Sequence, residues 1–235
     1  MGTSTDYGGG QGGAWTPFKR AATSYAKHGG RSRAERVVAR HVGTLGGAAG
    51  ATRSARAGIA GAANFADLLA GIARDGLTPT LRDAGLGDLV GRGRFDVVRA
   101  LVDVIAGAGS DLEGQAARAA ALDVIDELFA DAEAYDELAD LTLDADGLVR
   151  ALEAFIAYYI YNRLLPQIDE RLTRYADAAR AERLDGDLRQ LIRAQVRIRL
   201  RDVDPLAVDW SGAEGRRLIE SALRSVYGVL EDLEE

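Results

Sequence analysis

The chain has 235 residues, of which 47% are hydrophobic and 28% charged, and a formal net charge of −7, which suits one domain or two small ones. It contains no cysteine, so disulfide bonds, thiol nucleophiles and thiolate metal sites are excluded. The sequence has no run of about eighteen apolar residues and no charged-then-apolar leader, which predicts a cytoplasmic protein without a membrane span.

The charge is distributed unevenly along the chain. Residues 1–57 hold nine lysine and arginine residues against two acidic ones, whereas residues 58–235 hold 20 against 34. A positive front and a negative remainder predict one of two contacts. Either the front folds back on the chain's own acidic body, or it meets an acidic partner surface, nucleic acid included.

Residues 1–30 are predicted to form a flexible, glycine-rich N-terminal arm. Six of the first thirteen residues are glycine, and Tyr7 is the only sizeable apolar side chain after the initiator. Such a segment buries too little surface to offset its ordering entropy. The small residue at position 2 predicts removal of Met1, which leaves the α-amino group of Gly2 at the tip of the arm.

The second half of the arm, residues 14–30, carries aromatic side chains between basic ones. Trp15, Phe18 and Tyr25 predict a linker that docks on the chain's own domain or on a protein partner, although interleaved aromatic and basic residues also suit base stacking. A Gly29-Gly30 break is expected to end this linker.

From residue 31 onward, apolar spacing near 3.6 predicts a single all-α, bundle-like domain over residues 31–235. Helices are expected at 31–42, 51–74, 78–84, 94–106, 111–130, 143–165, 167–183, 187–201 and 212–233. Helix is preferred to strand for residues 196–201, although apolar residues alternate there. The most apolar helix, around Phe155, is expected at the centre, and Pro166 is expected to kink or end it.

Several short patterns predict helix ends and close packing. The glycines and alanines of residues 43–62 indicate tightly packed or broken helices. Capping boxes are expected at Ser110 with Glu113 and at Ser211 with Glu214, and an N-cap at Thr78 before Pro79.

No pattern in the sequence selects an active site. Residues 142–153 nearly match a calcium loop, but Thr142 and Arg150 replace expected ligands, so capping of the central helix by Thr142 or Asp144 is preferred. His28 and His41 are the only histidines and lack zinc-site spacing. The acidic residues sit as polar helix faces, and no serine-nucleophile motif is present. The sequence therefore predicts a protein that is not an enzyme and has no cofactor.

Two stretches resemble a known family. They are Met1-Gly2-Thr3-Ser4 leading into Tyr7-Gly8-Gly9, and Asp75-Gly76-Leu77 followed by Leu81-Arg82-Asp83-Ala84-Gly85-Leu86-Gly87-Asp88-Leu89-Val90-Gly91. Together they resemble QatB, the small helical component of QueC-associated (Qat) anti-phage defence systems. Trp15-Thr16-Pro17 is a shortened form of the proline-rich stretch associated with that family.

The resemblance implies partners and a role for the arm. The partners would be a QueC-like enzyme similar to 7-cyano-7-deazaguanine synthase, a P-loop ATPase and a TatD-like nuclease. Gly2 would be the acceptor of an ATP-dependent, deazaguanine-type modification. The partner-binding residues would be Thr3, Ser4, Tyr7, Gly8, Gly9, Trp15, Phe18, Arg33, Arg36 and Arg40.

Two other functions remain open from the residues themselves. One is a nucleic-acid-binding helical module that contacts phosphates through the basic residues of the front half, namely Lys19, Arg20, Lys27, Arg31, Arg33, Arg36 and Arg40. The other is a divalent-metal enzyme built on the acidic body.

Overall fold

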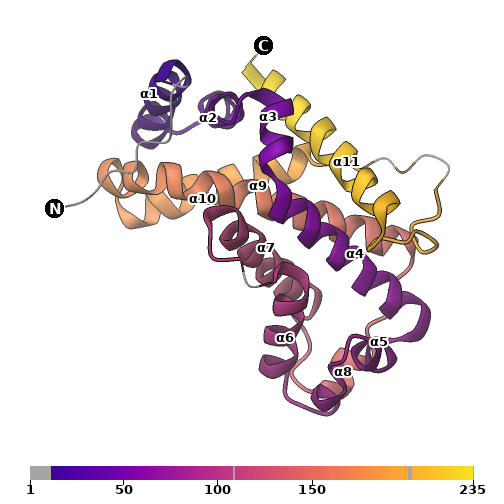
Figure 1. The fold of residues 1–235 in the computed structure, drawn as a ribbon. Coiled ribbons are helices and arrows are strands. Elements are labelled where there is room, and N and C mark those ends of the chain that lie inside the picture. The colour runs from indigo at the N-terminus through magenta and orange to yellow at the C-terminus, as the bar shows by residue number, and fades with distance from the viewer. Residues whose placement is uncertain (1–11, 108, 199, 201–202, 235) are drawn as a thin grey trace.

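The computed structural model describes residues 12–107, 109–198, 200 and 203–234. Within these residues it contains eleven α-helices, two 3-10 helices and no strand, which confirms the all-α prediction (Figure 1). The elements are α1 (Gly12–His28), α2 (Arg31–Thr44), α3 (Gly47–Ser54), α4 (Arg56–Asp75), α5 (Leu77–Asp83), η1 (Gly87–Leu89), α6 (Arg94–Ala106), α7 (Leu112–Leu128), α8 (Tyr135–Ala139), α9 (Ala145–Tyr175), α10 (Ala178–Gln195), α11 (Ala213–Glu231) and η2 (Asp232–Glu234).

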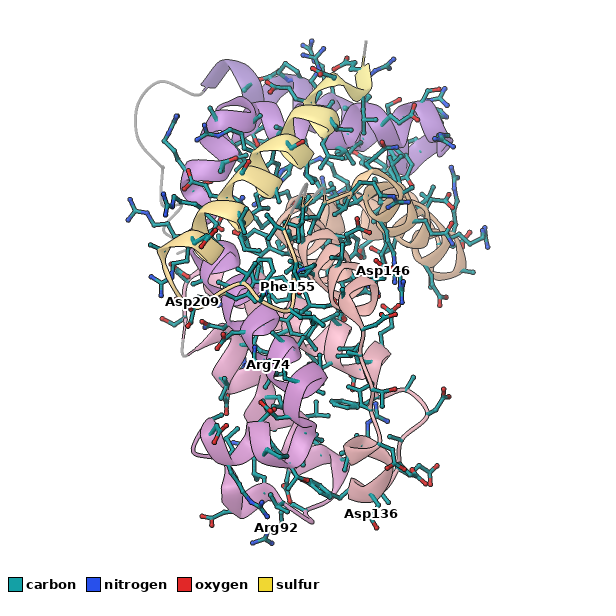
Figure 2. The ribbon with its side chains drawn as sticks, turned by 90° about the vertical axis from the view of Figure 1, so that its right-hand side faces the viewer. Arg74, Arg92, Asp136, Asp146, Phe155 and Asp209 are labelled. Carbon is teal, nitrogen blue, oxygen red and sulfur yellow. The ribbon has the colours of Figure 1, made fainter. Side chains whose placement is uncertain are left out.

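The 31-residue helix α9 forms the centre of the fold. It packs against α1, α4, α7 and α10, while α5, α6 and α8 lie at the opposite end of the molecule from α1 and α2 (Figure 1). Phe155 is fully buried near the middle (Figure 2) and stacks on Phe65 of α4, with 5.6 Å between the ring centroids. An apolar helix surrounded by others is the arrangement that the sequence predicts for this segment.

Glycines in α4 allow it to approach α9 closely. A Cβ atom at Gly58 would lie 2.3 Å from the ring of Tyr159, and one at Gly61 would lie 2.9 Å from the ring of Phe155. Any larger residue would push the two helices apart. Gly58 and Gly61 therefore form a helix-packing surface, and Gly46 and Gly47, both with positive φ, form the break between α2 and α3; both outcomes were predicted for this stretch.

Residues 12–28 form a helix where a linker is expected, but Phe18 and Tyr25 dock on the chain's own domain, which is one of the two predicted arrangements. This helix is α1, in which Phe18, Ala22 and Tyr25 are buried at helical spacing against α2 and α9. The Tyr25 hydroxyl donates to the Leu184 carbonyl oxygen at 2.5 Å. The folded domain therefore includes residues before 31, because the apolar stripe of α1 completes the core.

Helix boundaries differ from the prediction in the second half of the chain. Helix α9 continues through Pro166 to Tyr175, because buried Leu164, Ile168 and Leu172 hold both sides of the proline on the core. Helix α10 ends at Gln195, and residues 196–198 are irregular instead of helical. The Ile198 amide there donates to Glu153 Oε1 at 2.8 Å, which replaces a helical bond.

The predicted caps give a mixed result. Asp144 caps α9 by accepting from the Gly147 amide, as expected. Asp111, one residue after Ser110, caps α7. The N-cap residue of α11 is Gly212, which offers no side-chain cap, while Ser211 donates to Asp209. Thr78 lies inside α5 and contacts the Tyr135 hydroxyl. Asp111 caps α7 in place of the Ser110 hydroxyl predicted from the sequence, because Asp111 has the extended backbone conformation of an N-cap residue.

No helix in the described part of the chain is long and apolar enough to cross a membrane.

Candidate functional site

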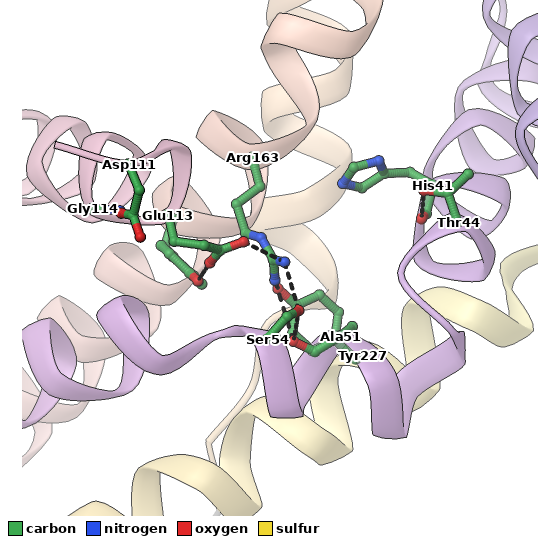
Figure 3. Close-up of polar contacts among 10 residues, drawn as sticks. His41, Thr44, Ala51, Ser54, Asp111, Glu113, Gly114, Arg163 and Tyr227 are labelled. Carbon is green, nitrogen blue, oxygen red and sulfur yellow. Dashed lines mark hydrogen bonds and ion pairs between the residues drawn. The ribbon is translucent and has the colours of Figure 1, made fainter. Parts of the chain in front are cut away.

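Arg163 of α9 forms a buried polar centre where α3, α7, α9 and α11 meet (Figure 3). Its guanidinium pairs with Glu113 Oε1 at 2.6 Å and donates to the Tyr227 hydroxyl at 2.7 Å. It also donates to Ser54 Oγ at 2.8 Å and to the Ala51 carbonyl oxygen at 3.3 Å. Four groups from three other helices thus satisfy one cation, which ties those helices to α9.

The electrostatics of this centre follow from its burial. Burial lowers the pKa of Arg163, but nearby Tyr227, Tyr159 and Glu113 outweigh that effect, and the net pKa is raised. Burial also raises the pKa of Tyr159, whose hydroxyl donates to Glu113. Burial raises the pKa of Tyr227 as well, so both phenols are neutral beside the Arg163 cation.

His41 of α2 lies beside this centre and points toward Arg163 (Figure 3). It is 3% exposed, and neither ring nitrogen has a hydrogen-bond partner in the structure. Its burial and the Arg163 cation lower its pKa to about 3, so the imidazole is neutral at physiological pH. The Phe18 ring packs on it, with 5.7 Å between centroids. An unpartnered buried imidazole is uncommon, because leaving such a group unbonded costs stability.

A pocket of about 340 Å³ opens next to His41. Its walls come from α1, α2, α7 and α9, and they include Trp15, His41, Glu113, Asn162 and Arg163. Trp15 contacts Phe18 edge to face at 5.7 Å, so the first turns of α1 form one side of this pocket.

A second hollow, which we call the α6–α7 groove, lies between those two helices. It has a volume of about 870 Å³ and an apolar floor of Phe95, Val98, Val102, Ala119 and Leu122. Phe95 is 77% exposed and Leu122 is 46% exposed. The basic residues Arg94, Arg99 and Arg118 line the same groove. Exposed apolar patches with a polar rim are typical of protein-binding surfaces.

The predicted site residues divide into two groups. Gly2, Thr3, Ser4, Tyr7, Gly8 and Gly9 lie outside the described residues. Trp15 is half-buried at the pocket, but Phe18 is fully buried. This corrects the expectation of Phe18 as a partner contact, because its apolar area is already used in the core.

The predicted basic contacts are largely engaged within the chain. Arg40 Nε lies 2.6 Å and Arg36 Nε 3.6 Å from the Glu234 carboxylate, and Arg33 donates to the Gly29 carbonyl oxygen. The positive front therefore contacts the acidic C-terminal end of the described chain, which is the first of the two contacts predicted from the charge distribution. These exposed pairs contribute little stability in water and remain open to competition by a partner.

The calcium-like stretch has a structural explanation. Asp144 caps α9, and Glu153 accepts from the Ile198 amide. Among the described residues, no cluster of three or more His, Cys, Asp or Glu side chains could hold a metal ion.

Sequence reasoning missed the polar centre and the pocket. One signal was present, because Arg163 and Asn162 interrupt the most apolar helix of the chain. A charged residue in such a helix usually needs a buried partner. The partner, Glu113, is 50 residues away and was taken for a capping residue.

Over the residues that the structure describes, fold and site define an all-helical protein with a buried arginine centre, a pocket beside it and the α6–α7 groove. Residues 46–230 match the family model described as "Qat anti-phage system associated protein QatB". The chain therefore belongs to the QatB family and is a component of a Qat anti-phage system. The match includes Glu113, Arg163 and the α6–α7 groove, while residues 1–45 precede it. No curated protein and no solved structure matches the chain.

Proposed function

We propose that this chain is a non-enzymatic component of its defence system that serves as protein substrate and scaffold. In this role its arm presents the Gly2 amine to a QueC-like enzyme for ATP-dependent, deazaguanine-type modification. The P-loop ATPase and the TatD-like nuclease are the further partners. Membership of the QatB family carries the proposal, together with the resemblance of the first nine residues to that family.

The chemistry of the arm supports Gly2 as the acceptor. A neutral amine is the nucleophile, and an ordinary α-amino group, with a pKa of about 8, is neutral far more often than a lysine with a pKa of about 10.4. The chain has two lysines, Lys19 and Lys27, and both lie on α1 behind the tip. Nine residues separate Gly2 from Gly12, the first residue of α1, and the ten steps between their Cα atoms span at most about 35 Å when extended, which is long enough to enter a deep site.

Blocking the terminus should abolish both modification and phage protection. An N-terminal tag that is not removed leaves no free Gly2 amine, while the helical domain keeps its core. The measurement is the intact mass of the protein purified with and without its neighbouring genes, together with a plaque assay.

The control is a chain with Lys19→Arg and Lys27→Arg, which removes the competing side-chain amines and should be modified normally. If the tagged protein still gains mass and still protects cells, the arm is only a linker and the substrate role is wrong.

The scaffold part of the proposal needs a docking surface, and the α6–α7 groove supplies the best one. Its apolar floor and arginine rim suit an amphipathic helix with acidic residues beside its apolar anchors. Arg94 and Arg118 are already paired with Asp126 and Asp103, at 3.1 and 2.6 Å. The acidic residues of a partner would therefore replace Asp126 and Asp103 in these weak surface ion pairs.

Phe95→Asp should weaken binding of the partner by about tenfold or more, because an exposed aromatic side chain in the wall of a docking groove is the kind of anchor that carries much of the binding energy. Val229→Asp is the matched control, since Val229 is 44% exposed on α11, away from the groove. Affinities measured by calorimetry with the purified QueC-like enzyme and the ATPase would test this. Equal affinities for both variants would remove the groove from the proposal.

A further inference from the structure

One edge of α7 carries a largely exposed row of residues with coiled-coil spacing. Leu112, Gln115, Ala119, Leu122 and Asp126 follow one another at intervals of three and four, which places them on one side of the helix. Leu112 is 64% exposed and Leu122 is 46% exposed, and Gln115 and Asp126 are exposed as well. We call this row the α7 seam. Its spacing is the one by which a helix packs along a second helix.

The α7 seam joins the two hollows of the candidate site. Gln115 and Ala119 line both the α6–α7 groove and the pocket beside His41. Leu112 lines the pocket, whereas Leu122 and Asp126 line the groove. At the α-helical rise per residue, the seam is about 21 Å long, which is about four turns. The two hollows are therefore the two ends of one surface.

The two ends of the seam differ in charge. Three arginines line the groove end against one aspartate, Asp126. The pocket end is mainly apolar, with walls that include Trp15 and Pro166. Its two charged side chains, Glu113 and Arg163, pair with each other at 2.6 Å. A matching occupant is therefore acidic toward the groove and apolar toward the pocket.

Two occupants that the chain itself could supply fit this surface poorly. A symmetric interface between two copies joins the same patch of each, so the arginines of one groove would face those of the other, and like charges across an interface weaken binding. Residues 1–11 contain one large apolar side chain after Met1, namely Tyr7, and therefore cannot place apolar residues at coiled-coil spacing. These arguments favour a helix from another protein.

We propose that the α7 seam is the docking site for a single amphipathic helix of another protein, about four turns long or more. Its apolar residues pack on Leu112, Ala119 and Leu122, and its acidic residues face the arginines at the groove end. A large apolar side chain at its other end fills the pocket between Trp15 and Pro166. The proposal rests on the scaffold role proposed above, and it extends the docking surface from the groove to the pocket under one partner helix.

Leu112→Asp distinguishes this seam from a groove that binds alone. Leu112 is the first residue of α7, where an added carboxylate is favourable for the helix, and it lies outside the α6–α7 groove. The fold should persist, while binding of the partner weakens about tenfold through the loss of an apolar anchor. Phe95→Asp should weaken the same complex.

Ala213→Asp is the matched control, because Ala213 is the exposed first residue of α11. It adds the same charge at the same helix position, away from the seam, and should leave the affinity unchanged. Calorimetry of the full-length variants with the purified QueC-like enzyme and with the purified ATPase measures these affinities.

The chain contains no cysteine, so one introduced thiol identifies the occupant directly. A photo-crosslinker attached at Gln115→Cys, in the middle of the seam, should react with one helical segment of the partner. Mass spectrometry should show apolar residues at intervals of three and four in that segment, with acidic residues toward one end. Ser221→Cys, exposed on α11, is the control and should give no such crosslink.

Three results would overturn the proposal. Equal affinities for Leu112→Asp and Ala213→Asp, with a weaker complex for Phe95→Asp, would confine docking to the groove and leave the scaffold role intact. Crosslinks from Gln115→Cys to a second copy of this chain would make the seam a dimer interface. If neither purified protein binds the unchanged chain, the scaffold role fails and the seam fails with it. None of these measurements depends on the modification of Gly2, so the substrate role is tested separately.

Discussion

Replacing Phe155 by alanine should lower the free energy of unfolding by about 3 to 5 kcal/mol. Phe155 is fully buried at the centre of α9 and stacks on Phe65. Its ring also contacts the α4 glycine surface at Gly61. Removal of the ring loses this burial and leaves a cavity that a long central helix cannot close by moving.

Chemical denaturation followed by circular dichroism at 222 nm measures this change. Phe95→Ala is the matched control, because Phe95 is 77% exposed and its loss should change the free energy of unfolding by less than about 0.5 kcal/mol. A loss below about 1 kcal/mol for Phe155→Ala would show that α9 is not the centre of the core.

Replacing Arg163 by methionine should lower the free energy of unfolding by about 3 kcal/mol, the low end of the range for breaking a buried ion pair. The change leaves Glu113, the Tyr227 hydroxyl and the Ser54 hydroxyl without their common donor. The low end applies because the Glu113 side chain is 28% exposed and keeps part of its hydration.

The double substitution Arg163→Met with Glu113→Gln should recover part of this loss, since no uncompensated carboxylate then remains. Thermal unfolding of the two single variants and the double variant gives the coupling energy. Strictly additive effects would show that Arg163 and Glu113 do not interact in solution.

The local pattern of the sequence predicts most of the helical architecture. The repeat of apolar residues near 3.6 identifies the helices, and the length of the apolar run places Phe155 and its neighbours at the centre. The small residues of α4 and the Asp144 cap are also local features. These predictions hold because each depends on residues within a few turns of one another.

Errors arose where a distant contact outweighs a local signal. The glycines and Pro17 around α1 are unfavourable for a helix and obscure its apolar stripe in the sequence. The segment is nevertheless helical, because α2 and α9 bury Phe18 and Tyr25 of that stripe. Pro166 removes one helical hydrogen bond, but packing on both sides keeps α9 continuous. Burial of several apolar side chains exceeds the cost of one backbone bond.

The polar features that define the candidate site were decided by the tertiary structure alone. Glu113 shares a polar centre with Arg163, and His41 reaches that centre from α2. Arg36 and Arg40 meet Glu234 across nearly the whole length of the chain. The charge pattern of a single sequence indicates that the charged side chains need ion-pair partners, but it does not show which residues those partners are. Only the packing of α2, α7 and α9 places His41, Glu113 and Arg163 around one pocket, because hydrogen bonds and ion pairs act over a few ångströms in space and not along the chain.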